Sequence, residues 1–117
     1  MINADVESLF AGKNPIVTEL FKAILEKLSY YDYDYGIEPK KTSLHLTNGA
    51  TFLGIHPKKN WLDITIVSTE ALDHPLLKKA EQVSKNRWHN DVRLSALTDL
   101  DDSLVSAIAH AYALRKK

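Results

Sequence analysis

The stretch TSLHLTNGATFLGI, residues 42–55, alternates apolar and polar side chains on both sides of Asn48-Gly49. An Asn-Gly pair between alternating segments is a strong signal for a β-hairpin, because a type I′ turn needs positive φ at both central residues. This two-residue turn predicts one register for the strand pair: Leu44 opposite Leu53, His45 opposite Phe52, and Lys41 opposite His56.

A second predicted hairpin, GIHPKKNWLDI, follows at residues 54–64, with residues 57–60 as its connection. This connection sets His56 opposite Trp61 and Ile55 opposite Leu62. Because side chains alternate across a sheet, the two registers sort the residues by face. One face is aliphatic and is predicted to lie on the core: Leu44, Leu46, Leu53, Ile55, Leu62, Ile64 and Ile66. The other, called the polar sheet face below, collects Lys41, Ser43, His45, Phe52, His56, Trp61, Asp63 and Thr65.

Amphipathic helices are predicted at both ends of the chain. A short helix over residues 5–10 is expected to end at Gly12, and a longer one starts at Asn14-Pro15, a pair typical of a helix N-terminus. Its apolar stripe has three- and four-residue spacing: Ile16, Val17, Leu20, Phe21, Ile24, Leu25 and Leu28. Near the C-terminus, Thr98 is the predicted cap of a helix that has acids in its first turn, Arg115, Lys116 and Lys117 at its end, and a buried stripe: Leu100, Leu104, Ile108, Ala111 and Tyr112.

Three further segments complete the predicted fold. RWHNDVRL, residues 87–94, is a fourth strand, with Trp88, Val92 and Leu94 on the core side and His89, Asp91 and Arg93 on the polar side. Residues 68–86 are ambiguous, and Pro75 is taken to start a short helix that ends near Val83. The tyrosine run at residues 30–36 is expected to pack against the rim of the core. The resulting prediction is one α+β domain over residues 1–117: a two-layer sandwich in which an antiparallel sheet of about four strands carries both terminal helices on one face.

Composition narrows the protein class. The 117 residues are 44% hydrophobic and 26% charged, with no net charge and no cysteine. No apolar stretch approaches the roughly 20 residues of a membrane span, and the N-terminus does not resemble a secretion signal, so we expect a cytoplasmic protein without a membrane role. Lys and Arg exceed acids by nine to six in residues 37–93, which also hold four of the five histidines.

Candidate functional residues gather on the polar sheet face. The sequence has no Gly-rich phosphate loop, nucleophile elbow or paired-histidine metalloprotease motif, and no cofactor is predicted. The cations and rings that remain suit a binding module for an anionic ligand, a nucleic acid or a protein partner. The candidate ligand-binding residues are Lys41, His45, His56, Trp61, His89 and Arg93.

The same residues leave alternatives open. His45, His56 and His89, with Asp63 or Asp91, would also serve a small, metal-assisted enzyme or an acid–base catalyst. Trp61 or an exposed sheet edge would serve a homodimer. In the structural alternative, Trp61 packs across His56 and the Pro57 ring and only holds the hairpin together.

Five segments also carry a family resemblance. In order along the chain they are LFAGKNPIVTELFKAILEKL, EPKKTSLHL, FLGIHPKKNWLDITI, EQVSKNRWHNDVRL and DLDDSLVSAIAHAYAL. Together they resemble the bacterial domain-of-unknown-function family 5655, some members of which are labelled predicted transport proteins. That family has no established activity, so the resemblance implies no catalytic residue. Among its motif positions, Gly12, Trp88 and Tyr112 are expected to be structural, whereas Lys41, His56 and His89 lack an evident packing role and are the first candidates for function.

Overall fold

The computed structural model of the chain describes residues 4–31 and 33–115. Its helices are α1 (Ala4–Ser8), α2 (Pro15–Ser29), the 3-10 helix η1 (Leu97–Asp99) and α3 (Asp102–Arg115). Its strands are β1 (Gly36–Pro39), β2 (Leu44–Thr47), β3 (Thr51–Pro57), β4 (Leu62–Ser68), β5 (Leu77–Ser84) and β6 (Arg87–Leu94). No helix in these two ranges is long and apolar enough to cross a membrane.

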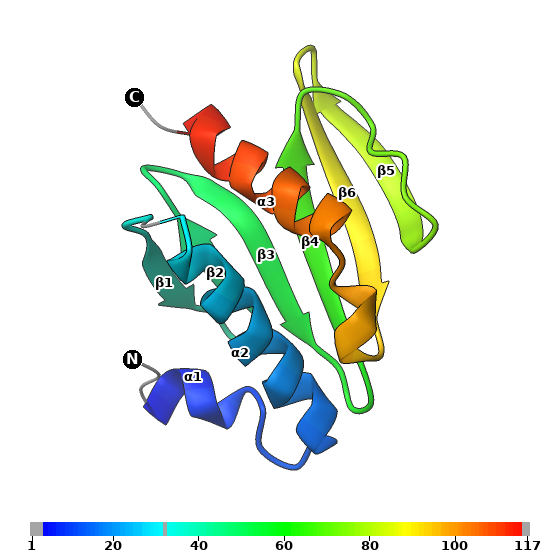
Figure 1. Ribbon diagram of the computed structural model, residues 1–117. Helices are drawn as coiled ribbons and strands as arrows, with labels where there is room; N and C mark the ends of the chain where they lie inside the picture. Colours follow the sequence, from blue (N-terminus) through cyan, green and yellow to red (C-terminus); the bar gives the residue numbers. More distant parts are fainter. Residues whose placement is uncertain (1–3, 32, 116–117) are drawn as a thin grey trace.

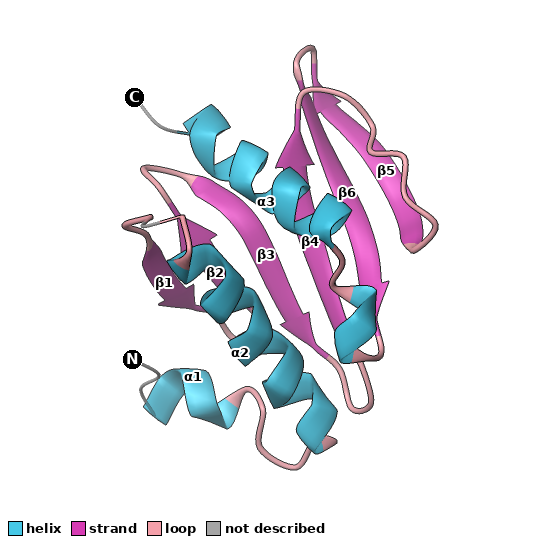
Figure 2. Cartoon of the chain, in the orientation of Figure 1, coloured by secondary structure: helices cyan, strands magenta, loops and turns pink. Residues whose placement is uncertain are grey.

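The strands form a single antiparallel sheet in the order β1-β2-β3-β4-β6-β5. The α-helices lie together on one face of this sheet, with α3 against β3 and β4 (Figure 1, Figure 2). The predicted α+β class, the antiparallel sheet and the helical layer are therefore confirmed. The predicted count of about four strands is wrong, because the described residues form six.

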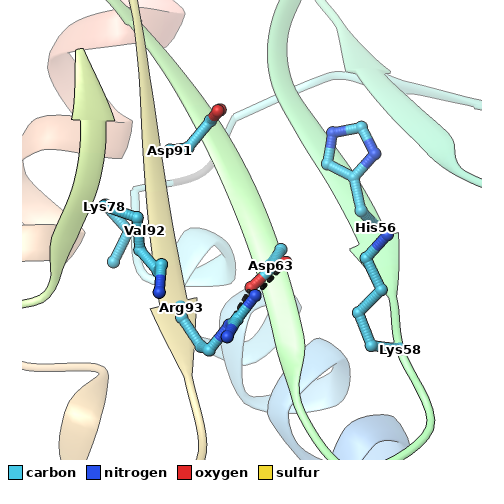
Figure 3. A pocket seen from close by; sticks show the side chains of 7 residues that line it. All are labelled: His56, Lys58, Asp63, Lys78, Asp91, Val92 and Arg93. Carbon is cyan, nitrogen blue, oxygen red and sulfur yellow. Dashed lines mark hydrogen bonds and ion pairs between the residues drawn. The ribbon is translucent and has the colours of Figure 1, made fainter.

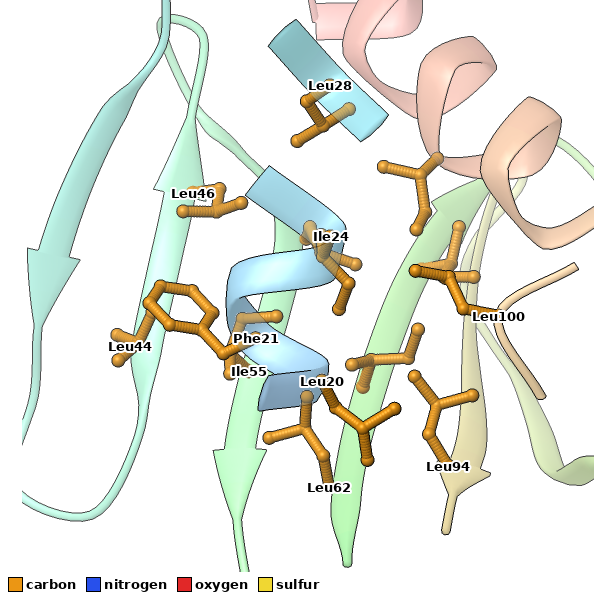
Figure 4. Packing of buried hydrophobic residues seen from close by; sticks show 14 of the residues in the cluster. Leu20, Phe21, Ile24, Leu28, Leu44, Leu46, Ile55, Leu62, Leu94 and Leu100 are labelled. Atoms are coloured by element: carbon orange, nitrogen blue, oxygen red, sulfur yellow. The ribbon is translucent and has the colours of Figure 1, made fainter. Parts of the chain in front are cut away.

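The core lies between the helices and the aliphatic sheet face, as predicted. All seven aliphatic residues assigned to that face are 0% exposed. They meet the buried stripe of α2, which includes Leu20, Phe21, Ile24 and Leu28 (Figure 4). The helix begins where expected, because the Asn14 side chain accepts a hydrogen bond from the Ile16 amide at 3.0 Å and Pro15 needs no donor in the first turn.

The first hairpin differs in register from the prediction. Leu44 lies opposite Ile55 and Leu46 opposite Leu53, and Phe52 is an extra residue between Leu53 and Thr51, which pairs with Thr47. The turn is longer than two residues, with Gly49 at φ 81°. Because the register moves by two, the aliphatic residues keep their face. Phe52 does not: the bulge turns it into the core, where it is 0% exposed, so its assignment to the polar sheet face is wrong.

The second hairpin is shifted in the same way. Its strands pair His56 with Asp63 and Pro57 with Leu62, whereas the sequence predicted Trp61 opposite His56. Trp61 lies in the connection, where its carbonyl accepts a hydrogen bond from the Lys58 amide at 3.0 Å. The loop therefore begins and ends one residue later than predicted, and Trp61 leaves the sheet. The residues that remain in the strands keep their face because the shift is even.

Both sheet edges were missed from the sequence. Residues 77–84 are rich in good helix formers and follow Pro75, which led to the predicted helix. Instead they pair with β6 as the edge strand β5, because the neighbouring strand supplies a hydrogen-bonding partner that outweighs local propensity. Strand β1 is short and ends in Pro39, a residue that sheets tolerate at an edge.

The C-terminal helix begins later than predicted. Thr98 lies inside η1, and the cap of α3 is Asp101, whose carboxylate accepts a hydrogen bond from the Leu104 amide at 2.9 Å. The pKa of Asp101 is lowered by this bond first and then by its bond to His74. The predicted stripe from Leu100 to Tyr112 is buried.

Part of the tyrosine run packs at the rim of the core, as expected: Tyr33 and Tyr35 lie against it, whereas Tyr30 is 74% exposed. Tyr33 stacks on Tyr112 with 3.8 Å between ring centroids, and Tyr31 stacks on Tyr33. The Tyr112 hydroxyl donates to the Asp34 carbonyl at 3.1 Å. Tyr112 and Gly12, at φ 75°, thus have the structural roles expected of them, whereas Trp88 remains partly exposed. Lys116 and Lys117 of the predicted basic helix end lie outside the described residues.

Asn90 is a fully buried amide that ties the β4–β5 connection to the sheet. Its side chain donates to the Ile66 carbonyl at 2.9 Å and the Ser68 hydroxyl at 2.8 Å, and it accepts from the Leu72 amide at 2.9 Å. No sequence pattern indicated this network.

Replacing Asn90 with alanine is expected to lower the unfolding free energy by about 2–3 kcal/mol, because it leaves buried partners without a hydrogen bond. Urea unfolding of Asn90→Ala measures the loss. Asn60→Ala, at an exposed position, is the matched control and should change stability by less than about 0.5 kcal/mol. Equal stability of the two variants would contradict the structural role of the Asn90 network.

Candidate functional site

The polar sheet face is not covered by the segment between β4 and β6. Strand β5 extends the sheet sideways. The connection before it lies against α3, where His74 Nε2 is 2.9 Å from Asp101 Oδ2. None of the described helices lies on this face (Figure 1). Its histidines are therefore half-buried by neighbouring side chains of the sheet rather than by a second layer.

Three of the six candidate residues meet at one hollow of about 390 Å³. His45 comes from β2, His56 from β3 and His89 from β6, and Arg87 joins them from the start of β6. The full lining is His45, Thr51, Gly54, His56, Thr65, Val67, Arg87 and His89, and none of these residues is an acid. We call this feature the Gly54 hollow.

The Gly54 hollow exists because β3 leaves two positions of the polar sheet face empty. Gly54 stands between His45 and Thr65 in the sheet and has no side chain. Phe52, the next residue with the same alternation, is turned into the core by the bulge. A Cβ at position 54 would lie 3.1 Å from His56 Nε2, so the glycine also gives the imidazole room to lie over the backbone.

A hydrogen-bonded chain crosses three strands beside the hollow. The Thr65 hydroxyl donates a hydrogen bond to Asp91 Oδ1 at 2.7 Å. The hydroxyl oxygen of Thr65 also lies 3.2 Å from His56 Nε2. A hydroxyl has one hydrogen, and Thr65 uses it in the hydrogen bond to Asp91. The contact with His56 therefore requires that His56 Nε2 carries a hydrogen and donates it to the Thr65 oxygen. Neutral His56 is therefore the Nε2–H tautomer, and its Nδ1 is an acceptor. On the other side of Gly54, His45 Nδ1 lies 3.2 Å from the Thr51 hydroxyl.

Burial lowers the pKa of His56 below the ordinary value of 6.5, and the charge of Lys58 lowers it further, while Asp91 raises it. An NMR titration of the imidazole should therefore place the pKa below 6.5, with Lys58→Ala raising it and Asp91→Asn lowering it. Because the folded protein binds this proton less readily than the unfolded chain, the stability contributed by neutral His56 is complete above pH 6.5 and is lost as pH falls through the folded pKa. A rise in pKa on Asp91→Asn would contradict the electrostatic role of that carboxylate.

Arg93 and Trp61 form a separate pair next to the Gly54 hollow. Arg93 makes two bonds to Asp63, Nε to Oδ1 at 3.0 Å and Nη2 to Oδ2 at 3.3 Å, and its guanidinium lies 4.2 Å from the centre of the Trp61 ring. This arrangement corrects the predicted pairing of Trp61 with His56. Hydrogen bonding to Asp63 raises the pKa of Arg93. The positive charge of Arg93 is compensated by the Asp63 carboxylate in this ion pair.

The Arg93–Asp63 pair borders a second hollow of about 320 Å³, shown in Figure 3. Its lining mixes cations and acids: His56, Lys58, Asp63, Lys78, Asp91, Val92 and Arg93. His56 stands between the two hollows. Lys41, the sixth candidate, is exposed in the β1–β2 connection and lines neither of them.

Within residues 4–31 and 33–115, no group of three or more His, Asp or Glu side chains is arranged to hold a metal ion. The three histidines thus share a hollow without the spacing of a ligand set.

Sequence reasoning missed part of this site. Arg87 is the first residue of a predicted strand and has the same alternation as His89, so its face could have been inferred. Gly54 carried a weaker signal: a glycine within a strand pattern often marks a place where a ligand or another chain approaches closely. The contribution of Thr65 depends on its neighbours across the sheet, which the correct register alone reveals.

The comparison with protein families gives one match. The model of the Domain of unknown function (DUF5655) matches residues 6–115, nearly the whole chain and every residue of both hollows. The chain belongs to the DUF5655 family. No curated protein and no solved structure matches it. The family assignment confirms the resemblance seen in the sequence and supplies no activity, so DUF5655 membership leaves function to be argued from the site.

Proposed function

We propose that this domain is an accessory binding module, not an enzyme, and that it holds a small anionic ligand in the Gly54 hollow. The observation that carries the proposal is the lining of that hollow: three histidines and one arginine, from three strands, without an acidic side chain. Hydrogen bonds from guanidinium and imidazole N–H groups to an oxyanion are among the strong ones in proteins. Arg87, His45 and His89 are the donors proposed for the anion, because the N–H of His56 is bonded to Thr65. The volume falls in the range of small-ligand sites, roughly 300–1,000 Å³.

Arg87 supports an anionic rather than a neutral ligand. None of the ion pairs among the described residues involves Arg87, whereas Arg93 is bonded to Asp63. An arginine cannot lose its proton in a protein and always presents donors. Arg87 therefore brings an uncompensated positive charge to the rim of the hollow.

The hydrogen-bonded chain favours binding over catalysis. Thr65 donates a hydrogen bond to Asp91 and accepts one from His56. A histidine that activates a hydroxyl nucleophile must instead accept the hydrogen bond from that hydroxyl. The chain instead fixes the orientation and the tautomer of the imidazole. A preorganised donor and acceptor set of this kind lowers the cost of binding a ligand.

Calorimetry with inorganic phosphate at pH 7 and constant ionic strength tests the proposal. Saturable binding in the millimolar range or tighter is expected, and Arg87→Ala should weaken it by about tenfold or more, because a hydrogen bond to a charged group is worth about 1.5–3 kcal/mol. Lys22→Ala removes the same charge from the exposed side of α2 and should leave the affinity unchanged. Absence of saturable binding, or an equal loss in both variants, would overturn the proposal.

A further inference from the structure

We propose that the ligand of the Gly54 hollow is a small phosphate monoester that also carries a hydroxyl group, in chemical class a sugar or polyol phosphate. This inference rests on the proposed function, because it names the ligand of the same site. It is motivated by an asymmetry among the residues that line the hollow: Arg87 brings positive charge, whereas neutral His56 has its one N–H bonded to Thr65 and offers only an acceptor.

The phosphate end is assigned to the β6 side of the hollow. Arg87 and His89 are two residues apart on one strand, so their side chains leave the same face about 6–7 Å apart. Val67 lies directly opposite His89 on β4, so no carboxylate faces His89 from within the hollow. The empty position at Gly54 lets a tetrahedral group approach the sheet backbone closely. A guanidinium and an imidazole at this spacing can share the three oxygens of one phosphoryl group.

The hydroxyl end is assigned to His56. Its Nε2–H is committed to Thr65, so in the neutral ring Nδ1 offers a lone pair. The lowered pKa keeps the ring neutral at pH 7. Figure 3 shows one ring nitrogen on the side of β4 and the other turned away from it. A lone pair repels a phosphate oxygen and accepts a hydrogen bond from an alcohol, so a ligand that satisfies the whole hollow needs both groups.

The surroundings of the hollow favour a small molecule over a nucleic acid. Acids flank the acid-free lining in the adjacent strands: Glu81 lies opposite His89 on β5, and Glu38 lies opposite His45 on β1. Asp91 follows His89 on the same face of β6. A polyanion that filled the hollow would continue past these carboxylates, whereas one phosphate monoester would not.

The test compares glycerol 3-phosphate with propyl phosphate, which has the same carbon chain and phosphate but no hydroxyl groups. Wild-type protein should bind glycerol 3-phosphate about fivefold more tightly at pH 7, the value of one neutral hydrogen bond of about 1 kcal/mol. In His56→Phe the ratio of the two affinities should fall to about one. Thr65→Val removes the hydroxyl that holds the hydrogen on His56 Nε2 but keeps the imidazole, so it should also lower the ratio. It provides a second variant if His56→Phe does not fold.

The outcomes separate this inference from the proposed function. Equal wild-type affinities for the two monoesters would overturn the hydroxyl assignment and leave anion binding standing. Tighter binding of a ten-nucleotide oligothymidylate than of glycerol 3-phosphate would overturn the small-ligand class. Failure of both monoesters and of inorganic phosphate to bind would overturn the proposed function itself.

Discussion

Phe52→Ala is expected to destabilise the protein by about 3–5 kcal/mol, the usual cost of removing a buried aromatic side chain. Phe52 is 0% exposed, and its ring meets Tyr112 and Tyr35 edge to face, at centroid distances of 5.3 and 6.3 Å. Tyr112 comes from α3 and Tyr35 precedes β1, so the truncation opens a cavity where three parts of the chain meet. Chemical denaturation, compared at equal temperature and buffer, measures the loss.

The Phe52 variant also tests the bulge in β3. Had the two-residue turn predicted from Asn48-Gly49 been correct, Phe52 would lie on the polar sheet face, and its removal would cost little. Tyr30→Ala is the matched control, because it removes a large aromatic ring that is 74% exposed. A loss for Phe52→Ala as small as that for Tyr30→Ala would contradict the register described here.

Gly54→Ala is expected to reduce anion binding by about tenfold or more, equivalent to about 1.4 kcal/mol. The new Cβ would stand 3.1 Å from His56 Nε2 and 3.4 Å from the Thr65 Cβ, so the imidazole must move and the floor of the hollow rises. The φ of Gly54 is not positive, so alanine fits the backbone, and the fold should survive. Phosphate calorimetry measures the affinity.

Unfolding in urea provides the control for Gly54→Ala, because no other glycine is a matched position. Gly12 and Gly49 have positive φ, and a Cβ at Gly36 would lie 2.8 Å from the Thr47 hydroxyl oxygen. Stability near the wild-type value with weakened binding is the expected pair of results. Unchanged phosphate affinity in a folded Gly54→Ala protein would show that the hollow is not the site.

The faces of the central strands could be predicted from the sequence, although their register could not. Both hairpins are shifted by two residues, and an even shift leaves the seven aliphatic residues that were assigned to the core face on that face. The bulge at Phe52 breaks this rule because it inserts one residue, an odd number. Local sequence does not reveal such a bulge, which is stabilised by distant partners such as Tyr112.

The edge strands could not be predicted for the same reason, because they too depend on partners that are distant in the sequence. Residues 77–84 have the composition of a helix, and only their pairing with β6 makes them a strand. In the site, His45, His56 and His89 were correctly grouped by alternation and share a hollow. Lys41 was grouped with them through the predicted register and lies apart, because the actual register removes it from the partner strand of His56.

Mapping phosphate-induced shifts in a ¹H–¹⁵N NMR spectrum tests the central claim most directly. Binding in the Gly54 hollow predicts saturable shifts centred on the amides of Gly54, Thr65, Arg87 and His89, absent in a sodium chloride titration of equal ionic strength. Saturable shifts centred instead on Lys58 and Lys78, around the neighbouring hollow, or no saturable shifts at all, would contradict it.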